Sequence, residues 1–95
     1  MQLRVKSNER FIVSNQPYIL HLATVHDSIM DRWFTCFYQA DGHKLYIEEE
    51  VGGPGGVLKQ IADTNLHTCV FQFIDSSGLL KEPFLPTGLI KQRNV

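Results

Sequence analysis

Several composition signals are absent from the 95-residue sequence, and each absence removes a class of protein. Lys and Arg number nine against ten Asp and Glu, for a net charge of -1, so no positive excess favours nucleic acid or an anionic membrane. No apolar run reaches the roughly 18 residues of a membrane helix, and the first residues lack the apolar stretch of a signal peptide. We therefore expect neither a membrane nor a nucleic-acid partner.

Cysteine is scarce, since the chain contains only Cys36 and Cys69. Two cysteines do not make the framework of a disulfide-rich secreted domain, although a single bridge would be compatible with the sequence. A reduced, cytoplasmic setting is the prediction that follows. Metal-binding spacings are missing too, because His67 and Cys69 have no clustered partner, and His21 or His43 could join them only across a sheet. We expect no metal ion and no other cofactor.

The glycine-rich segment 52–56, GGPGG, does not match a phosphate-binding loop. Lys59 comes third after Gly56, with no Ser or Thr following it, and Pro54 removes a backbone donor. We predict a crossover from a strand to a helix, with Gly56 as a weak helix N-cap. The three carboxylates at 48–50 are interpreted as protection of a sheet edge. No Ser or Cys stands in a nucleophile motif either, so we predict no catalytic residue.

The clearest local signal is a hairpin between residues 32–40 and 43–50. Asp41-Gly42 separates two runs rich in aromatic and β-branched residues, a pattern that favours a two-residue type I′ turn. Counting from this turn predicts the cross-strand pairs, from Ala40–His43 to Phe34–Glu49. Because side chains alternate between faces, one face is predicted to be the core face. That face carries Phe34, Cys36, Tyr38, Leu45 and Ile47.

The opposite face of this hairpin is the candidate binding surface. Its aromatic side chains have a polar rim, a composition typical of protein interfaces and of platforms for small ligands. Burial beneath another element of the same chain is the alternative. The whole face comprises Trp33, Thr35, Phe37, Gln39, Lys44, Tyr46 and Glu48. The binding residues that we predict among them are Trp33, Phe37, Tyr46, Lys44 and Gln39.

The other segments predict further strands and one helix. Residues 2–6 and 10–14 form a plausible first hairpin, and residues 18–25 form another strand. Residues 57–64 place apolar side chains on one side of a short helix that has to dock to persist. Residues 66–75 are apolar on both faces, which predicts a central strand.

Together these segments predict a single α+β domain over residues 1–95. We expect an antiparallel sheet of five to six strands with one short helix, at about 57–64, packed on one face. Prolines at 83 and 86 exclude a central strand near the end of the chain, so residues 79–95 are predicted to form an extended C-terminal arm.

The leading functional hypothesis is a small non-enzymatic protein-binding or regulatory accessory protein that acts through the aromatic sheet face. The alternative is a small-molecule-binding protein, or a small enzyme, with a pocket at a dimer interface. A flat apolar patch would favour the first, and a deep pocket containing Trp33 or Tyr46 beside a histidine would favour the second. We also expect a homodimer, because one short helix cannot cover all the apolar strand faces.

Overall fold

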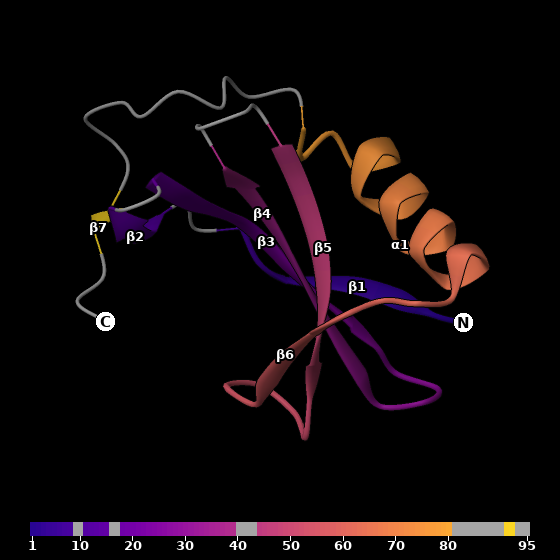
Figure 1. Cartoon of the computed structure of the whole chain (residues 1–95). Helices are drawn as coiled ribbons and strands as arrows, with labels where there is room; N and C mark the ends of the chain where they lie inside the picture. Colours follow the sequence, from indigo (N-terminus) through magenta and orange to yellow (C-terminus); the bar gives the residue numbers. More distant parts are fainter. Residues whose placement is uncertain (9–10, 16–17, 40–43, 81–90, 93–95) are drawn as a thin grey trace.

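The computed structural model of the protein describes residues 1–8, 11–15, 18–39, 44–80 and 91–92. It shows a twisted sheet with one helix packed on one face, which confirms the predicted α+β class (Figure 1). In chain order the elements are β1 (Leu3–Ser7), β2 (Phe11–Asn15), β3 (Tyr18–Asp27), β4 (Arg32–Gln39), β5 (Lys44–Val51), β6 (Val57–Gln60), α1 (Thr64–Ser76) and β7 (Lys91–Gln92).

The strands follow the order β6-β5-β4-β3-β2-β7, and β1 also pairs with β3. Strands β1 to β6 pair antiparallel, as predicted, whereas the two-residue β7 pairs parallel with β2. β1 lies along residues 24–27 of β3, and β2 lies along residues 18–21 of the same strand. The predicted hairpin between 2–6 and 10–14 is therefore wrong, because the two segments follow one another along β3.

Irregular register bends the part of the sheet around β3. The pairing shifts between Val5 and Ser7 in β1, between Ile12 and Ser14 in β2, and again within β3 where it meets β4. Bulges of this kind bend a strand and increase its twist. Strands at opposite sides of the sheet consequently curl around the face away from α1, so that β1, β2 and β6 all contribute residues to one side of the sheet. We call this face the concave face.

The β4–β5 hairpin has the predicted register, from Phe34–Glu49 to Gln39–Lys44. Its turn, with Asp41-Gly42 and the Ala40–His43 pair, lies outside the described residues. The predicted core face is confirmed, since it packs beneath α1 with Leu45 partly buried at its margin. The core cluster comprises Leu20, Leu22, Val25, Phe34, Cys36, Tyr38, Ile47, Leu66, Val70 and Ile74.

The helix is not where the sequence predicted it. Residues 57–60 form strand β6, and the helix α1 occupies the segment 66–75 that was predicted to be a central strand. The buried side chains of α1 are Leu66, Val70 and Ile74. Their spacing of four residues places them on one side of a helix, and equally on one face of a strand. The apolar pattern alone therefore could not separate the two structures.

Asp63 starts the helix and is the local signal that resolves this ambiguity. Its carboxylate accepts hydrogen bonds from the backbone N–H groups of Asn65, at 2.9 Å, and Leu66, at 3.3 Å. Asp is among the preferred N-cap residues because it pairs donors that have no partner within the helix. The predicted N-cap at Gly56 is thus wrong by seven positions.

The glycine-rich segment turns the chain between β5 and β6, rather than crossing from a strand to a helix. Val51 pairs with Val57, which closes a hairpin around residues 52–56. Gly52 and Gly53 have φ of 91° and 98°, in the region that favours glycine. The carboxylates at 48–50, predicted to guard an edge, lie on a strand paired on both sides, by β4 and β6.

Only parts of the predicted arm at 79–95 belong to the described residues. Leu79 and Leu80 pack against the core, and Lys91–Gln92 form β7. Residues 81–90 and 93–95 lie outside the described part of the chain. Within that described part, no helix combines the length and the apolar character needed to cross a membrane.

Candidate functional site

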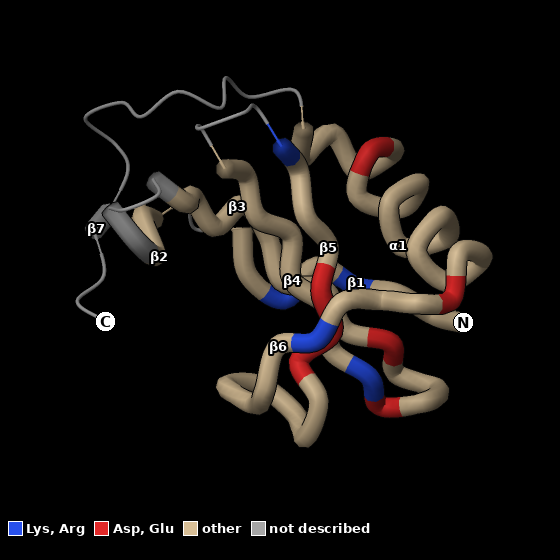
Figure 2. Tube along the Cα trace, viewed as in Figure 1, with Lys and Arg blue, Asp and Glu red and all other residues tan. Residues whose placement is uncertain are grey.

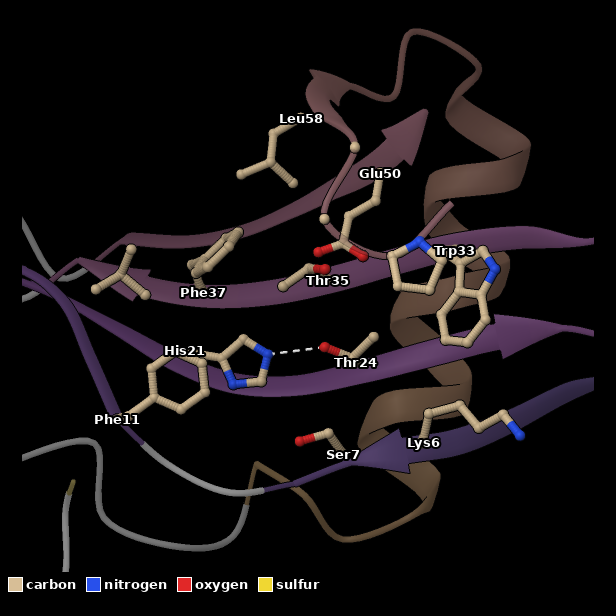
Figure 3. Close-up of a pocket in the computed structure, with 14 residues that line it drawn as sticks. Lys6, Ser7, Phe11, His21, Thr24, Trp33, Thr35, Phe37, Glu50 and Leu58 are labelled. Atoms are coloured by element: carbon tan, nitrogen blue, oxygen red, sulfur yellow. Dashed lines mark hydrogen bonds between the residues drawn. The ribbon is translucent and has the colours of Figure 1, made fainter. Parts of the chain in front are cut away.

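Two adjoining hollows occupy the concave face, and Figure 3 shows the larger of them. The larger, which we call the Trp33 hollow, has a volume of about 600 Å³, and its walls include Phe11, His21, Trp33, Thr35 and Glu50. The smaller, which we call the Tyr46 hollow, has a volume of about 230 Å³, and its walls include Ile19, Gln39, Tyr46 and Glu48.

The two hollows form one groove, because Val13, Phe37 and Leu58 line both of them. The groove follows β4 from Trp33 to Gln39. Six steps along a strand, at about 3.3 Å each, make it about 20 Å long. Its walls rise on one side from β5 and β6 and on the other from β1, β2 and β3.

Four of the five predicted binding residues lie in this groove. Trp33, Phe37, Gln39 and Tyr46 line one or both hollows, whereas Lys44 is exposed and lines neither of them. The Tyr46 hydroxyl donates a hydrogen bond to Oε1 of Gln39 at 2.6 Å, which fixes both side chains at one end of the groove. Alternation along the hairpin was therefore enough to predict that these four side chains share one face of the sheet.

Trp33 is held at the other end of the groove by His26. The two rings stack with their centroids 4.3 Å apart, because His26 and Trp33 are paired across β3 and β4. Nε2 of His26 lies 2.8 Å from a carboxylate oxygen of Asp31, in the turn between these strands. The indole is thus positioned by a histidine that is itself fixed by a carboxylate.

His21 forms part of the groove floor, and the sequence did not reveal this. The residue is 4% exposed, and its ring stacks on that of Phe11, with centroids 4.4 Å apart, while the Phe37 ring meets it edge-on. Nε2 of His21 lies 2.8 Å from the hydroxyl oxygen of Thr24 (Figure 3). Phe11 and His21 meet because β2 pairs with β3. The sequence instead predicted that residues 10–14 pair with residues 2–6.

Acidic residues run along β5 (Figure 2), and their side chains alternate between the two faces of the sheet. Glu49 points to the helix side, where Arg32 donates two hydrogen bonds to its carboxylate, at 2.9 and 2.7 Å. This Arg32 hydrogen bonding holds the pKa of Glu49 below its usual value, against the opposing effect of burial. Glu48 and Glu50 face the groove, and neither carboxylate has an ion pair or hydrogen bond within the described residues.

Thr35 presents a third polar group without a partner among the described residues. The residue is 1% exposed, and its hydroxyl oxygen makes no hydrogen bond to any described residue. It lies opposite Glu48 in the β4–β5 register and lines the Trp33 hollow. A buried hydroxyl without a partner costs about 1–3 kcal/mol, so a hydrogen-bond donor that entered the groove would gain from meeting it.

The described residues hold no group of three or more His, Cys, Asp or Glu side chains that could bind a metal ion. His67 and Cys69 lie on α1, on the other side of the sheet from His21. Cys36 is buried in the core and Cys69 is exposed, so the two thiols lie in different environments. Comparison with protein-family models, with curated proteins and with solved structures finds no match.

Proposed function

We propose that the chain is a small non-enzymatic binding protein that holds an extended segment of a partner protein in the concave groove. The observation that carries this proposal is the continuity of the two hollows along β4. A groove of about 20 Å matches about six residues of extended chain. The aromatic and polar mixture contributed by Trp33, Tyr46 and Gln39 is typical of the residues that dominate protein interfaces.

A small molecule is the second candidate, because Trp33 and His21 line the same hollow. Its volume of about 600 Å³ lies in the usual range of ligand sites, roughly 300–1,000 Å³. Such sites bury most of the ligand surface, whereas this hollow continues into a second one and offers room for a longer chain. For this reason we favour the extended segment. Either ligand would be held by side chains of one protomer.

Self-association remains a prediction, and the reason for it changes. Residues 66–75, predicted to be a strand with apolar side chains on both faces, form the helix α1 instead, so that strand no longer supports a dimer. Exposed apolar side chains on the edge strand β6 support it in its place, since Val57 is 66% and Leu58 41% exposed. We predict a homodimer in a cytoplasmic setting. Light scattering at micromolar concentration measures the mass, and the mass of a single chain would contradict the dimer.

The proposed function can be tested with random peptides in place of the partner protein. Selection of the full chain against a displayed library of such peptides should enrich peptides that bind it. Tyr46→Ala should weaken these peptides about tenfold, as expected for an aromatic anchor at an interface. The matched control is Phe71→Ala, which removes an exposed aromatic ring from α1.

Two outcomes would contradict the extended-segment proposal. One is the absence of enriched peptides, and the other is a set of peptides that bind Tyr46→Ala as well as they bind the parent chain. Trp33 is the only tryptophan, so its fluorescence reports directly on occupation of the groove. A small-molecule screen that shifts this fluorescence, in the absence of any peptide binder, would support the second candidate instead.

A further inference from the structure

We infer that the groove selects a basic segment, in which two Lys or Arg side chains two positions apart lie against Glu48 and Glu50. This inference rests on the proposed binding of an extended segment and names the chemistry of that segment. It is carried by the spacing of the two carboxylates, by the charge balance of the groove walls, and by the unpaired hydroxyl of Thr35.

The spacing follows from the strand on which the carboxylates stand. Glu48 and Glu50 lie on the same face of β5, and Glu49 between them points to the other side. Residues two apart on a strand are about 6.6–6.8 Å apart. A peptide that runs extended beside β5 has the same repeat, so cations at positions i and i+2 can meet both carboxylates together. Cations at i and i+1 would point to opposite sides of the peptide.

The charge balance of the groove walls favours a basic partner. Glu49 is already paired with Arg32, but Glu48 and Glu50 have no charged partner among the described residues. Of the described residues that line the two hollows, Lys6 is the one Lys or Arg. Its ammonium group points away from Glu50 (Figure 3). A basic segment would supply the missing charge, and such complementarity favours one class of partner over others.

Trp33 and Thr35 complete a site for one cationic group beside Glu50. Trp33 pairs with Glu50 across the hairpin, so a cation held by this carboxylate lies near the indole ring, which attracts cations to its face. Lys and Arg side chains have N–H donors and no acceptor, so they can donate to the Thr35 oxygen as well. That oxygen is buried and has no hydrogen-bond partner among the described residues, so a donor that reaches it supplies the missing bond.

Fluorescence polarisation of four labelled peptides of equal length tests this inference on the full chain. In one extended, uncharged background they carry two Arg at i and i+2, two Arg at i and i+1, two Gln at i and i+2, or two Glu at i and i+2. The first should bind about tenfold more tightly than the Gln peptide, as two partly exposed ion pairs allow. Its affinity should also fall as salt rises.

Variants of the protein connect the preference to the two carboxylates. Glu48→Gln and Glu50→Gln should each weaken the i, i+2 Arg peptide about threefold to fivefold, the value of one such ion pair. Asp75→Asn removes an exposed carboxylate on α1 and should change nothing. The double substitution Glu48→Lys with Glu50→Lys should lose the Arg peptide and gain the Glu peptide, a reversal that general damage to the fold would not produce.

The outcomes separate this inference from the proposed function. If the Gln or Glu peptide binds as tightly as the i, i+2 Arg peptide, or if the Gln variants bind it unchanged, the basic preference is wrong and the groove keeps its proposed role. If none of the four peptides binds while library peptides bind in a Tyr46-dependent manner, the basic preference is also wrong. If no library peptide binds either, the proposed function fails with it.

Discussion

The two faces of β4 show how differently alternate residues of one strand are used. On the helix side, Phe34 and Cys36 are 0% exposed and belong to the same apolar cluster as the buried side chains of α1. On the groove side, Thr35 is almost as deeply buried, at 1%, yet its hydroxyl has no partner within the described residues. On the helix side the buried groups are apolar and well packed, whereas on the groove side a buried polar group lacks a hydrogen bond.

This difference separates stability from binding. The helix side is a closed apolar core, so changes there should act on the free energy of unfolding. The groove side combines aromatic rings with unpaired polar atoms, so changes there should act mainly on what the groove binds. A domain of about this size buries only about 60–70% of its unfolded surface, and it has little stability to spare for groups that lack partners.

The largest expected effect comes from removing the ring at the centre of the helix side. Phe34→Ala leaves a cavity between β4 and α1 and should lower the free energy of unfolding by about 3–5 kcal/mol. Urea denaturation followed by circular dichroism measures it. The control is Phe71→Ala, because Phe71 is 36% exposed on α1, and it should cost much less. Equal costs for the two variants would contradict the assignment of the buried face.

The second effect concerns the N-cap of α1. Asp63→Ala removes the N-cap carboxylate and leaves two backbone N–H groups without their acceptor. The expected loss is about 1 kcal/mol, and at most about 2. Asp75→Asn, near the other end of the same helix, should have little effect on the urea midpoint. If both substitutions were silent, Asp63 would not be the start of the helix.

The same helix shows which part of the fold could be predicted from the sequence. The Asp41-Gly42 signal set the register of the β4–β5 hairpin, and alternation then sorted its two faces correctly. Residues 66, 70 and 74 carried no such signal, since their spacing fits a helix and a strand equally well. The N-cap at Asp63 was present in the sequence and would have favoured the helix.

The candidate site was predictable where it depends on that hairpin and obscure where it depends on distant strands. Trp33, Phe37 and Tyr46 follow from alternation along two neighbouring strands. His21 faces the groove because it pairs with Phe37 across β3 and β4, and the register of that pairing shifts by one residue directly after His21. A shift of this kind moves side chains to the other face, and no local pattern in the sequence records it.

The third effect is an acid-dependent loss of stability on the helix side. Arg32 holds the pKa of Glu49 below its ordinary value of 4.5. Its ionised form therefore stabilises the fold at pH above that ordinary value, and this contribution disappears as pH falls through the lower pKa of the folded state. Backbone N–H groups, among them those of Gln2 and Ile29, lower the pKa of Asp27 despite its burial, so this carboxylate acts in the same direction.

Glu49→Gln tests the contribution of the ion pair. Because the Arg32 side chain is 36% exposed, solvent screens the pair and the expected loss at neutral pH is about 0.5–1 kcal/mol. Denaturation from pH 7 to pH 3 should show a weaker acid dependence for this variant than for the parent. Glu50→Gln, on the groove side, should keep the parent free energy of unfolding at pH 7, because this carboxylate has no ion pair or hydrogen bond among the described residues. If both variants lost the same stability at pH 7, the two faces would not differ in their ion pairing.

The smallest expected effect is a gain in the free energy of unfolding, and it tests the difference between the two faces of β4 most directly. Thr35→Val replaces the unpaired hydroxyl with a methyl group of similar size, so the free energy of unfolding should stay constant or rise by roughly 0.5 kcal/mol. Thr24→Val is the matched control, because the Thr24 oxygen lies 2.8 Å from Nε2 of His21, and its loss should destabilise by about 1 kcal/mol. Thr35→Val should also weaken the i, i+2 Arg peptide. Equal destabilisation by the two substitutions would mean that Thr35 is already paired in the free protein. A gain in stability together with weaker peptide binding would show that the Thr35 hydroxyl forms its hydrogen bond with the ligand and not within the free protein.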